Sequence, residues 1–314
     1  MINGVINIYK EKGYTSHDVV AKLRGIFHQK KIGHTGTLDP DAEGVLLVCL
    51  GKATKICDIL TDRDKTYETV MLLGVDTDTQ DISGNVKKTG EPETDVRKIM
   101  DAIDSFVGEY DQIPPMYSAL KVNGRKLYEL ARDGIEVERK PRRIVIKSIR
   151  VNEINPDEHT VRMTVECSKG TYIRTLCHDI GEALGCGACM KELKRVAVGD
   201  FQVSSAVTLG SVQAKVLLGN AGDDIIPVDS IFSQMRAAHT SESADAAVHN
   251  GNSVMLDEKF VQIEGEPVAE SGESFRMYDS AGNFIGIYAC DEAVLKNVKM
   301  FYDSEEAIKQ GVDG

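Results

Sequence analysis

The sequence predicts an α+β protein in which a large domain is followed by a small β-barrel module. Three observations lead to this prediction. Amphipathic helical patterns alternate with strand-like runs through residues 1–235, residues 236–252 have the weak periodicity of a linker, and residues 253–305 hold short strand-like runs separated by turns. A chain of 314 residues can bury a full core and is long enough for both parts.

The first predicted elements are a strand over residues 4–9 and a helix that begins at Thr15 or Ser16. Either hydroxyl side chain can cap the helix, and apolar residues then recur at helical spacing through Phe27. The same patterns predict later strands over 45–50, 67–75, 142–151 and 160–167, helices over 94–107 and 171–184, and short helices within 206–235.

The C-terminal strands are predicted from short alternating runs. These runs cover residues 259–263, 274–278, 284–289 and 298–302, and a Ser-Ala-Gly-Asn turn separates the second from the third. The pattern is typical of a small β-barrel.

The net charge of −12 argues at first against a nucleic-acid partner, but the charges are distributed unevenly. Residues 1–200 are almost neutral, and the acidic excess lies in residues 201–314. Within 121–150 basic side chains outnumber acidic ones, and they include Lys121, Arg142 and Arg143. Such a strip fits a phosphate-binding surface, and it fits a plain solvated face equally well.

No stretch of the sequence has the length of apolar residues that a membrane span needs, and the N-terminus lacks the pattern of a signal peptide. We therefore expect a cytoplasmic protein with no membrane partner. The seven cysteines are typical of reduced core thiols. Cys186 and Cys189 form a C-x-x-C pair, but no second pair follows, so the sequence favours no metal site.

Asp39 is the leading candidate for a reactive carboxylate. It lies in a turn-rich segment between Gly36 and Pro40, directly before the apolar run 45–50. A desolvated aspartate is a candidate nucleophile or general base. Arg174, about 135 residues further on, could keep Asp39 ionised and orient it. The sequence lacks the usual signatures of nucleotide hydrolysis, dinucleotide binding, zinc proteolysis and serine hydrolysis.

Several segments occur together in one order along residues 4–200. They are Gly-His-Thr-Gly-Thr-Leu-Asp-Pro over 33–40, Gly-Lys-Ala-Thr-Lys over 51–55, Asp-Lys-Thr-Tyr over 64–67, Thr-Asp-Thr over 77–79 with Asp81, Gln-Ile-Pro-Pro-Met-Tyr-Ser-Ala-Leu-Lys over 112–121, and Ser-Lys-Gly-Thr-Tyr-Ile-Arg over 168–174. This set closely resembles the signature of the TruB family, the bacterial tRNA pseudouridine-55 synthases. The C-terminal module resembles the family's PUA-type RNA-binding appendix.

The resemblance implies a pseudouridine synthase fold, with a mixed, mainly antiparallel central sheet flanked by helices. It divides the chain into a catalytic domain (1–235), a linker (236–252) and a PUA-like module (253–305). The implied activity is the isomerisation of uridine 55 in the T-loop of tRNA, after base flipping, by an enzyme that needs no cofactor, metal or guide RNA and acts as a monomer.

The resemblance also implies roles for individual residues. Asp39 is the expected nucleophile, attacking either the sugar or the base, and Arg174 pairs with it. Tyr67 is expected to stack on the flipped base and is a candidate for assisting proton removal from C5. The expected lining of the substrate site is His34, Tyr172 and Leu193.

The sequence departs from the family pattern at two places. Glu11 follows Lys10 where a proline is usual, and we expect this to loosen the turn. The C-terminal module is acidic, which leaves fewer cations for RNA phosphates. Two other hypotheses are a tRNA-binding or tRNA-folding module without essential catalysis, and a guide-RNA-dependent synthase. Asp39, Tyr67 and Arg174 favour an enzyme over the binding module, and the segment between Asp76 and Tyr117, which resembles the stand-alone family's insertion, argues against the guide-RNA-dependent type.

Overall fold

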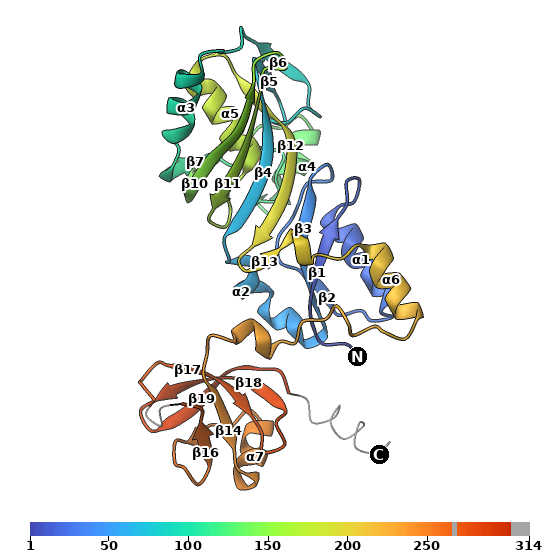
Figure 1. Cartoon of the computed structure of the whole chain (residues 1–314), viewed down its shortest axis with the longest axis vertical. Helices are drawn as coiled ribbons and strands as arrows, with labels where there is room; N and C mark the ends of the chain where they lie inside the picture. Colours follow the sequence, from blue (N-terminus) through green and yellow to red (C-terminus); the bar gives the residue numbers. More distant parts are fainter. Residues whose placement is uncertain (266–268, 303–314) are drawn as a thin grey trace.

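The computed structural model describes residues 1–265 and 269–302 of an elongated molecule (Figure 1). One large sheet runs through the upper and middle parts of Figure 1, and the C-terminal module lies at the lower end. The large sheet has nine strands: β1 (Gly4–Lys10), β2 (Ile32–His34), β3 (Glu43–Leu50), β4 (Lys65–Leu73), β7 (Gly108–Gln112), β10 (Arg142–Asn155), β11 (Thr160–Cys167), β12 (Ala188–Val198) and β13 (Phe201–Gln202).

The strand order in this sheet is β1-β3-β12-β4-β11-β10-β7. In addition, β2 pairs with β3, and β13 pairs with β12. Every strand pair of this sheet is antiparallel except β3 with β12, which are parallel and share only the pairs Glu43–Lys194 and Gly44–Arg195. The predicted mixed, mainly antiparallel sheet is confirmed. Two halves of this sheet are therefore joined through a short parallel contact.

The half formed by β1 and β3 is buried on both faces. One face packs against α1 (Ser16–Ile26) and α6 (Leu209–Leu217). The other packs against the short helices η1 (Gly51–Ile56), α2 (Cys57–Thr61) and η3 (Asp229–Phe232). A strand covered on both sides needs an unbroken apolar run, and β3 has one.

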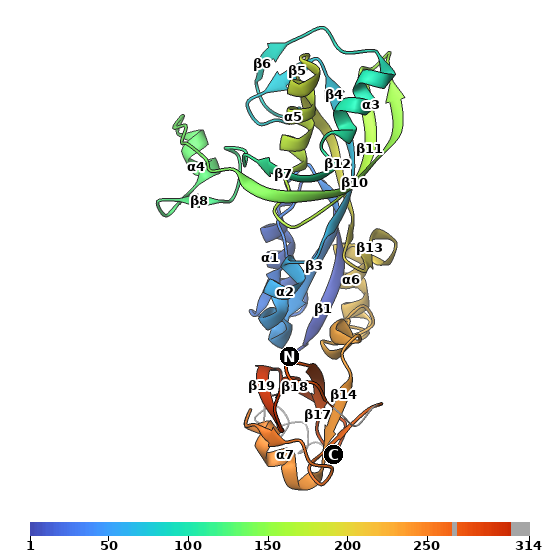
Figure 2. The ribbon, with the colours of Figure 1, turned by 90° about the vertical axis from the view of Figure 1, so that its left-hand side faces the viewer.

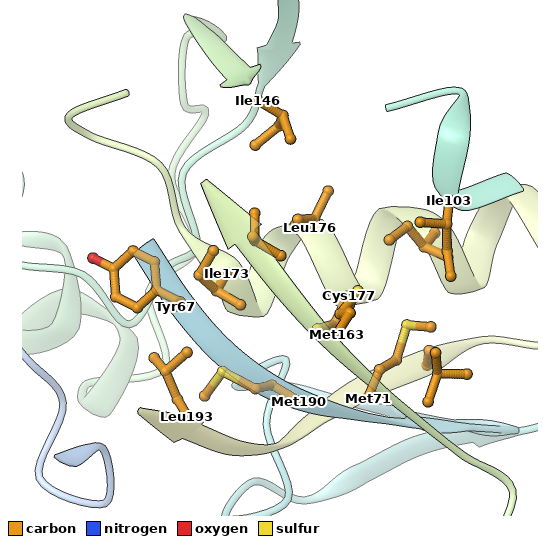
Figure 3. Close-up of a cluster of buried hydrophobic side chains, with 14 of the residues drawn as sticks. Tyr67, Met71, Ile103, Ile146, Met163, Ile173, Leu176, Cys177, Met190 and Leu193 are labelled. Carbon is orange, nitrogen blue, oxygen red and sulfur yellow. The ribbon is translucent and has the colours of Figure 1, made fainter. Parts of the chain in front are cut away.

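The other half of the sheet is buried on one face only. There, α3 (Val96–Asp104) and α5 (Ile173–Leu184) cover β4, β10, β11 and β12, and the core includes Met71, Met163 and Leu176 (Figure 3). The opposite face carries exposed charged side chains such as Glu68 and Arg162. This one-sided burial produces the alternation that predicts β10 and β11 from the sequence.

Short elements complete the large domain. The hairpin of β5 (Val75–Thr77) and β6 (Val86–Thr89) lies at the upper end of Figure 1. A second hairpin, β8 (Lys121–Val122) with β9 (Arg125–Lys126), continues into α4 (Leu127–Arg132) and projects from the body as an arm (Figure 2). The 3-10 helix η2 (Val203–Ser205) follows β13.

The C-terminal module is a six-stranded, barrel-like sheet. Its strands are β14 (Ala237–Thr240), β15 (Val254–Met255), β16 (Val261–Ile263), β17 (Ser274–Tyr278), β18 (Phe284–Asp291) and β19 (Val294–Met300), in the order β15-β19-β18-β17-β14-β16. The predicted small β-module is therefore present. Residues 303–305 of the predicted module lie outside the described residues.

The prediction of a linker over residues 236–252 is wrong. This segment contains β14, which lies between β16 and β17 in the sheet, and α7 (Glu242–His249). Small residues carry the packing here, because Ala237 and Ala238 are the buried apolar residues of β14, and α7 buries only Ala244 and Val248. Such side chains give little hydrophobic periodicity, so the sequence pattern resembled a linker.

Two further sequence-based expectations can be compared with the described residues. No helix in 1–265 or 269–302 has the length and apolar character needed to cross a membrane. Cys186 and Cys189 are buried free thiols, and within the described ranges no three His, Cys, Asp or Glu side chains are grouped so that they could hold a metal ion.

The parallel contact between β3 and β12 requires glycine at position 44. Gly44 has φ of +106°, and a Cβ there would lie 2.2 Å from the Arg195 carbonyl oxygen. We predict that Gly44→Ala lowers the free energy of unfolding by about 3 kcal/mol or more. Gly13→Ala is the matched control, since Gly13 also has positive φ (+87°) but open space around its Cβ position.

The control is expected to cost about 1 kcal/mol, the penalty of the backbone conformation alone. Both values come from denaturant unfolding curves. Equal losses in the two variants would contradict the close approach of β3 and β12.

Candidate active site

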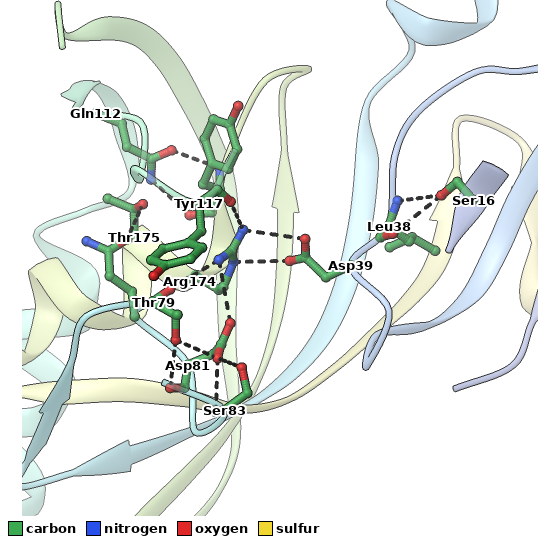
Figure 4. Close-up of polar contacts among 12 residues, drawn as sticks. Ser16, Leu38, Asp39, Thr79, Asp81, Ser83, Gln112, Tyr117, Arg174 and Thr175 are labelled. Carbon is green, nitrogen blue, oxygen red and sulfur yellow. Dashed lines mark hydrogen bonds and ion pairs between the residues drawn. The ribbon is translucent and has the colours of Figure 1, made fainter. Parts of the chain in front are cut away.

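Asp39 lies on a short loop whose two ends are fixed by strand pairing. The loop connects β2 and β3, which pair antiparallel, and the Thr35 amide donates a hydrogen bond to the Leu47 carbonyl oxygen (3.1 Å). In the middle of the loop the Leu38 amide donates to Ser16 Oγ (2.9 Å) at the start of α1 (Figure 4). The loop is therefore held from both the sheet and the helix.

Lys10 also anchors this loop, through hydrogen bonds from its side chain. Its side chain is fully buried, and Nζ donates to the carbonyl oxygens of Tyr14 (2.6 Å), Pro40 (3.1 Å) and Glu11 (3.2 Å). Burial lowers the pKa of the Lys10 ammonium to about 8. Although Glu11 replaces the usual proline, Lys10 stays buried and the Glu11 carbonyl is one of its three acceptors.

The structure brings Arg174 to Asp39, as the sequence predicts. Arg174 Nε lies 3.0 Å from Asp39 Oδ2, and Nη2 lies 3.4 Å from Oδ1 (Figure 4). Arg174 stands in the first turn of α5, in the half of the sheet opposite to the Asp39 loop. The two side chains meet where the halves join, and the two-point contact fixes the orientation of the carboxylate.

Arg174 is itself held by a second set of acceptors. Nη2 donates to the Tyr117 carbonyl oxygen (2.8 Å), and Nη1 donates to the Thr79 carbonyl oxygen (3.1 Å) and lies 3.5 Å from Asp81 Oδ2. Only 7% of the Arg174 side chain is exposed. The guanidinium therefore binds two carboxylates in a nearly dry setting.

The environment of Asp39 raises its pKa above the ordinary value. Burial is the main cause, Arg174 opposes it, and the nearby Asp81 carboxylate adds to the rise. The side chain nevertheless keeps 39% of its surface accessible. A basic, oriented and accessible carboxylate is suited to nucleophilic attack.

Tyr67 and Leu193 form an apolar wall beside this site. They belong to β4 and β12, only 8% of each residue is exposed, and their side chains lie next to each other at the edge of the core (Figure 3). Burial raises the pKa of the Tyr67 hydroxyl, so the phenol is neutral at pH 7.

His34 and Tyr172 are both partly buried. The His34 ring meets His17 edge-on at 5.2 Å between centroids, and burial lowers its pKa, so the imidazole is neutral at pH 7. Gln112 fixes the backbone of Tyr172, since its side chain accepts from the Tyr172 amide (2.8 Å) and donates to the Tyr172 carbonyl oxygen (3.1 Å).

The three basic residues predicted to contact RNA differ in their surroundings. Arg143 is bound to Asp111 and Glu109, with Nε 2.7 Å from Asp111 Oδ1. Arg142 and Lys121 are exposed, and within the described part of the chain neither has an acidic side chain within 4 Å. Arg142 is the first residue of β10 and pairs in register with Gln112 of β7. Its positive charge acts on the Tyr172 hydroxyl.

Sequence reasoning did not assign a role to Asp81 or Arg195. Asp81 orients Arg174, and Arg195 is a buried guanidinium that contacts the loop of Asp39. Asp81 belongs to the motif that includes Thr-Asp-Thr over 77–79, so the match to the family pattern marked this residue as a candidate. Arg195 follows Leu193 by two residues on β12, a strand that the sequence analysis did not predict.

The comparisons with known proteins agree with this geometry. Residues 24–173 match the family model described as TruB family pseudouridylate synthase (N terminal domain), and residues 174–235 match the tRNA pseudouridylate synthase B C-terminal domain. Among solved structures, a chain from an H/ACA RNP bound to a substrate RNA containing 2′-deoxyuridine is similar, with a TM-score of 0.68 and 27% identity over 96% of this chain and 85% of that one.

Two bacterial proteins named tRNA pseudouridine synthase B are similar over nearly the whole chain. The protein from Lachnoclostridium phytofermentans is 48% identical over 96% of this chain and 100% of its own. The protein from Bacillus subtilis (strain 168) is 39% identical over 98% of this chain and 100% of its own. With the fold, the two family models and these relatives in agreement, the chain belongs to the TruB family of pseudouridylate synthases.

Proposed function

We propose that this protein isomerises uridine 55 in the T-loop of tRNA to pseudouridine. The observation that carries the proposal is the Asp39–Arg174 ion pair, which holds an accessible carboxylate at the centre of a pseudouridine synthase fold. The relatives' shared name supports tRNA as the substrate. We further propose, from the likeness to bacterial proteins named tRNA pseudouridine synthase B, that the protein acts in the cytoplasm as a monomer, without guide RNA, metal or cofactor.

The chemistry assigned to Asp39 is nucleophilic attack on the target nucleotide, at the sugar or at the base. Asp39 bonds to C1′ as the bond between C1′ and N1 breaks, or adds to the base before that bond breaks; the uracil then rotates, a new bond forms between C1′ and C5, and the bond to Asp39 breaks again. A proton leaves C5 and one is taken up at N1, so the product is an isomer of the substrate. Arg174 favours the ionised form of Asp39 before the attack and orients its oxygens.

Access to the glycosidic bond requires that the nucleotide be flipped out of the T-loop, at a cost of a few kcal/mol. In our proposal Tyr67 stacks on the flipped base, which returns roughly 1–3 kcal/mol, and its hydroxyl assists removal of the C5 proton. Leu193 closes the apolar side of the site, and His34 and Tyr172 line the remaining edges.

We assign RNA-backbone contacts to Lys121 and Arg142, with a smaller contribution from Arg143, because two carboxylates already neutralise Arg143. The arm that carries Lys121 projects from the body and can reach along a bound RNA (Figure 2). We propose that the C-terminal module, residues 253–305 together with the segment 236–252, is a PUA-like RNA-binding unit. Its acidic side chains weaken its binding to RNA phosphates.

The central prediction concerns Asp39. Purified protein is incubated with unmodified tRNA transcript, and pseudouridine is mapped by chemical labelling and primer extension. We expect product at position 55, and we expect Asp39→Asn to lower the single-turnover rate by roughly 10⁴-fold or more, because the nucleophile is lost. Asp41→Asn, an exposed neighbour on the same loop, is the matched control and should retain activity.

A tRNA-folding module without essential catalysis predicts a different outcome. In that case Asp39→Asn would retain its tRNA affinity and its biological effect, and wild-type protein would form little or no product at the T-loop uridine.

The raised pKa of Asp39 predicts an acidic limb in the pH profile. Attack requires the ionised carboxylate, so the single-turnover rate falls as the pH drops through the Asp39 pKa, at a pH above the ordinary aspartate value of 3.8. Since Asp81 helps to raise this pKa, Asp81→Asn should move the limb to lower pH as well as slow the reaction. Asp157→Asn, in an exposed turn, should leave the limb in place.

The measurement is the single-turnover rate between pH 4.5 and 8 with saturating protein. A limb that stays at the same pH in Asp81→Asn would show that another group controls it.

The salt dependence of tRNA binding distinguishes Arg142 from Arg143. Each phosphate contact contributes about one unit to the slope of log K against log salt. We expect Arg142→Gln to weaken tRNA binding and to lower the slope by about one unit, and Arg143→Gln to have a smaller effect. Filter binding at several salt concentrations gives both slopes, and an unchanged slope in Arg142→Gln would identify that residue as part of a plain solvated face.

A further inference from the structure

Arg195 occupies the junction between the two halves of the sheet. It lies on β12, pairs in register with Tyr67 on β4, and pairs with Gly44 in the parallel contact with β3. Only 2% of the residue is exposed. The arginine is therefore enclosed between the strand that carries Tyr67 and the loop that carries Asp39.

The charge of Arg195 is not neutralised by a carboxylate. Within residues 1–265 and 269–302, no aspartate or glutamate oxygen lies within 4 Å of its guanidinium, whereas Arg174 has two such partners. Its charge acts on the cations Lys10 and Lys65, whose pKa values it helps to lower. A buried cation without a counter-ion costs free energy, so stability alone does not account for an arginine at this position.

Two backbone carbonyls anchor the guanidinium in one orientation. Nε donates to the Val45 carbonyl oxygen (2.7 Å), and Nη2 lies 3.4 Å from the Gly36 carbonyl oxygen. Gly36 and Val45 bracket the loop of Asp39. The planar group is therefore fixed on the same loop that positions the proposed nucleophile.

Arg195 and Tyr67 are register partners on neighbouring strands, so their side chains leave the sheet on the same face, and the Arg195 charge opposes the burial that raises the pKa of the Tyr67 hydroxyl. The ring of Tyr67 packs in the apolar core, with its hydroxyl at the edge of the cluster (Figure 3). An arginine can only donate hydrogen bonds, so a guanidinium that faces the phenol oxygen engages a lone pair of that oxygen. The phenolic hydrogen must then point away from Arg195.

We propose that Arg195 is a positioning residue for Tyr67: it fixes the phenol oxygen and the direction of its O–H bond in the synthase site. This inference rests on the proposed function. It predicts that Arg195 affects the chemical step through the Tyr67 hydroxyl and has little effect on tRNA affinity, because the buried guanidinium is not placed to contact phosphates.

The first test is a double-mutant cycle between Arg195→Lys and Tyr67→Phe. Arg195→Lys keeps the charge but loses the planar, two-sided donor group. We expect it to lower the single-turnover rate about tenfold or more while the Kd for tRNA changes by less than about twofold, and we expect this loss to fall below about threefold in the Tyr67→Phe background. Arg63→Lys is the control, since Arg63 is paired with Asp200 away from the site.

An equal loss of rate from Arg195→Lys in both backgrounds would overturn the proposal, because it would show that Arg195 acts independently of the hydroxyl. Thermal unfolding of each variant separates this result from a general loss of folding.

A second readout does not depend on activity. Protein labelled with ¹³Cζ-tyrosine gives a Tyr67 resonance, which is assigned by its absence in Tyr67→Phe. We expect this resonance to titrate at higher pH in Arg195→Met than in wild type, because the donor that stabilises the phenolate is lost. An unchanged titration would overturn the proposal. Failure of the wild-type protein to modify uridine 55 would count against the proposed function, while this titration would still test the contact.

Discussion

The ion pair between Asp39 and Arg174 is the interaction on which the rest of the site depends. Asp39 belongs to the half of the sheet built from β1 and β3, and Arg174 belongs to α5, which packs on the other half. The strands of the two halves share only a short parallel contact. Loss of Arg174 leaves the carboxylates of Asp39 and Asp81 without their shared counter-ion in a site surrounded by protein, so the pair couples the shape of the site to the fold.

Buried cations that donate to backbone carbonyls reinforce this arrangement. Lys10 holds the Pro40 carbonyl, and Arg195 holds the carbonyls of Gly36 and Val45. The loop is thereby fixed on both sides of Asp39 by side chains from β1 and β12. A loop held in this way needs little rearrangement before it reacts, which is the condition under which fixed charges contribute most to catalysis.

Sequence patterns predicted the elements whose packing is regular. A capped amphipathic pattern located α1, an unbroken apolar run located β3, and alternation located β11. The motif match supplied Asp39 and Arg174, whose contact the structure confirms. β12 was not predicted, because charged residues interrupt its apolar pattern and its pairing with β4 contains register shifts. The role of Arg195 could not be inferred from the sequence, since it depends on β4, β12 and the Asp39 loop, which meet only in the folded chain.

The central claim is that the two-point contact from Arg174 makes Asp39 a competent nucleophile. The most direct measurement is the single-turnover rate of pseudouridine formation by Arg174→Lys at saturating tRNA. A lysine keeps the charge but cannot bind the carboxylate at two points or hold Asp81 and the Thr79 and Tyr117 carbonyls at once. The account predicts a rate at least about 100-fold below wild type with nearly unchanged tRNA affinity. A rate close to that of wild type would contradict it.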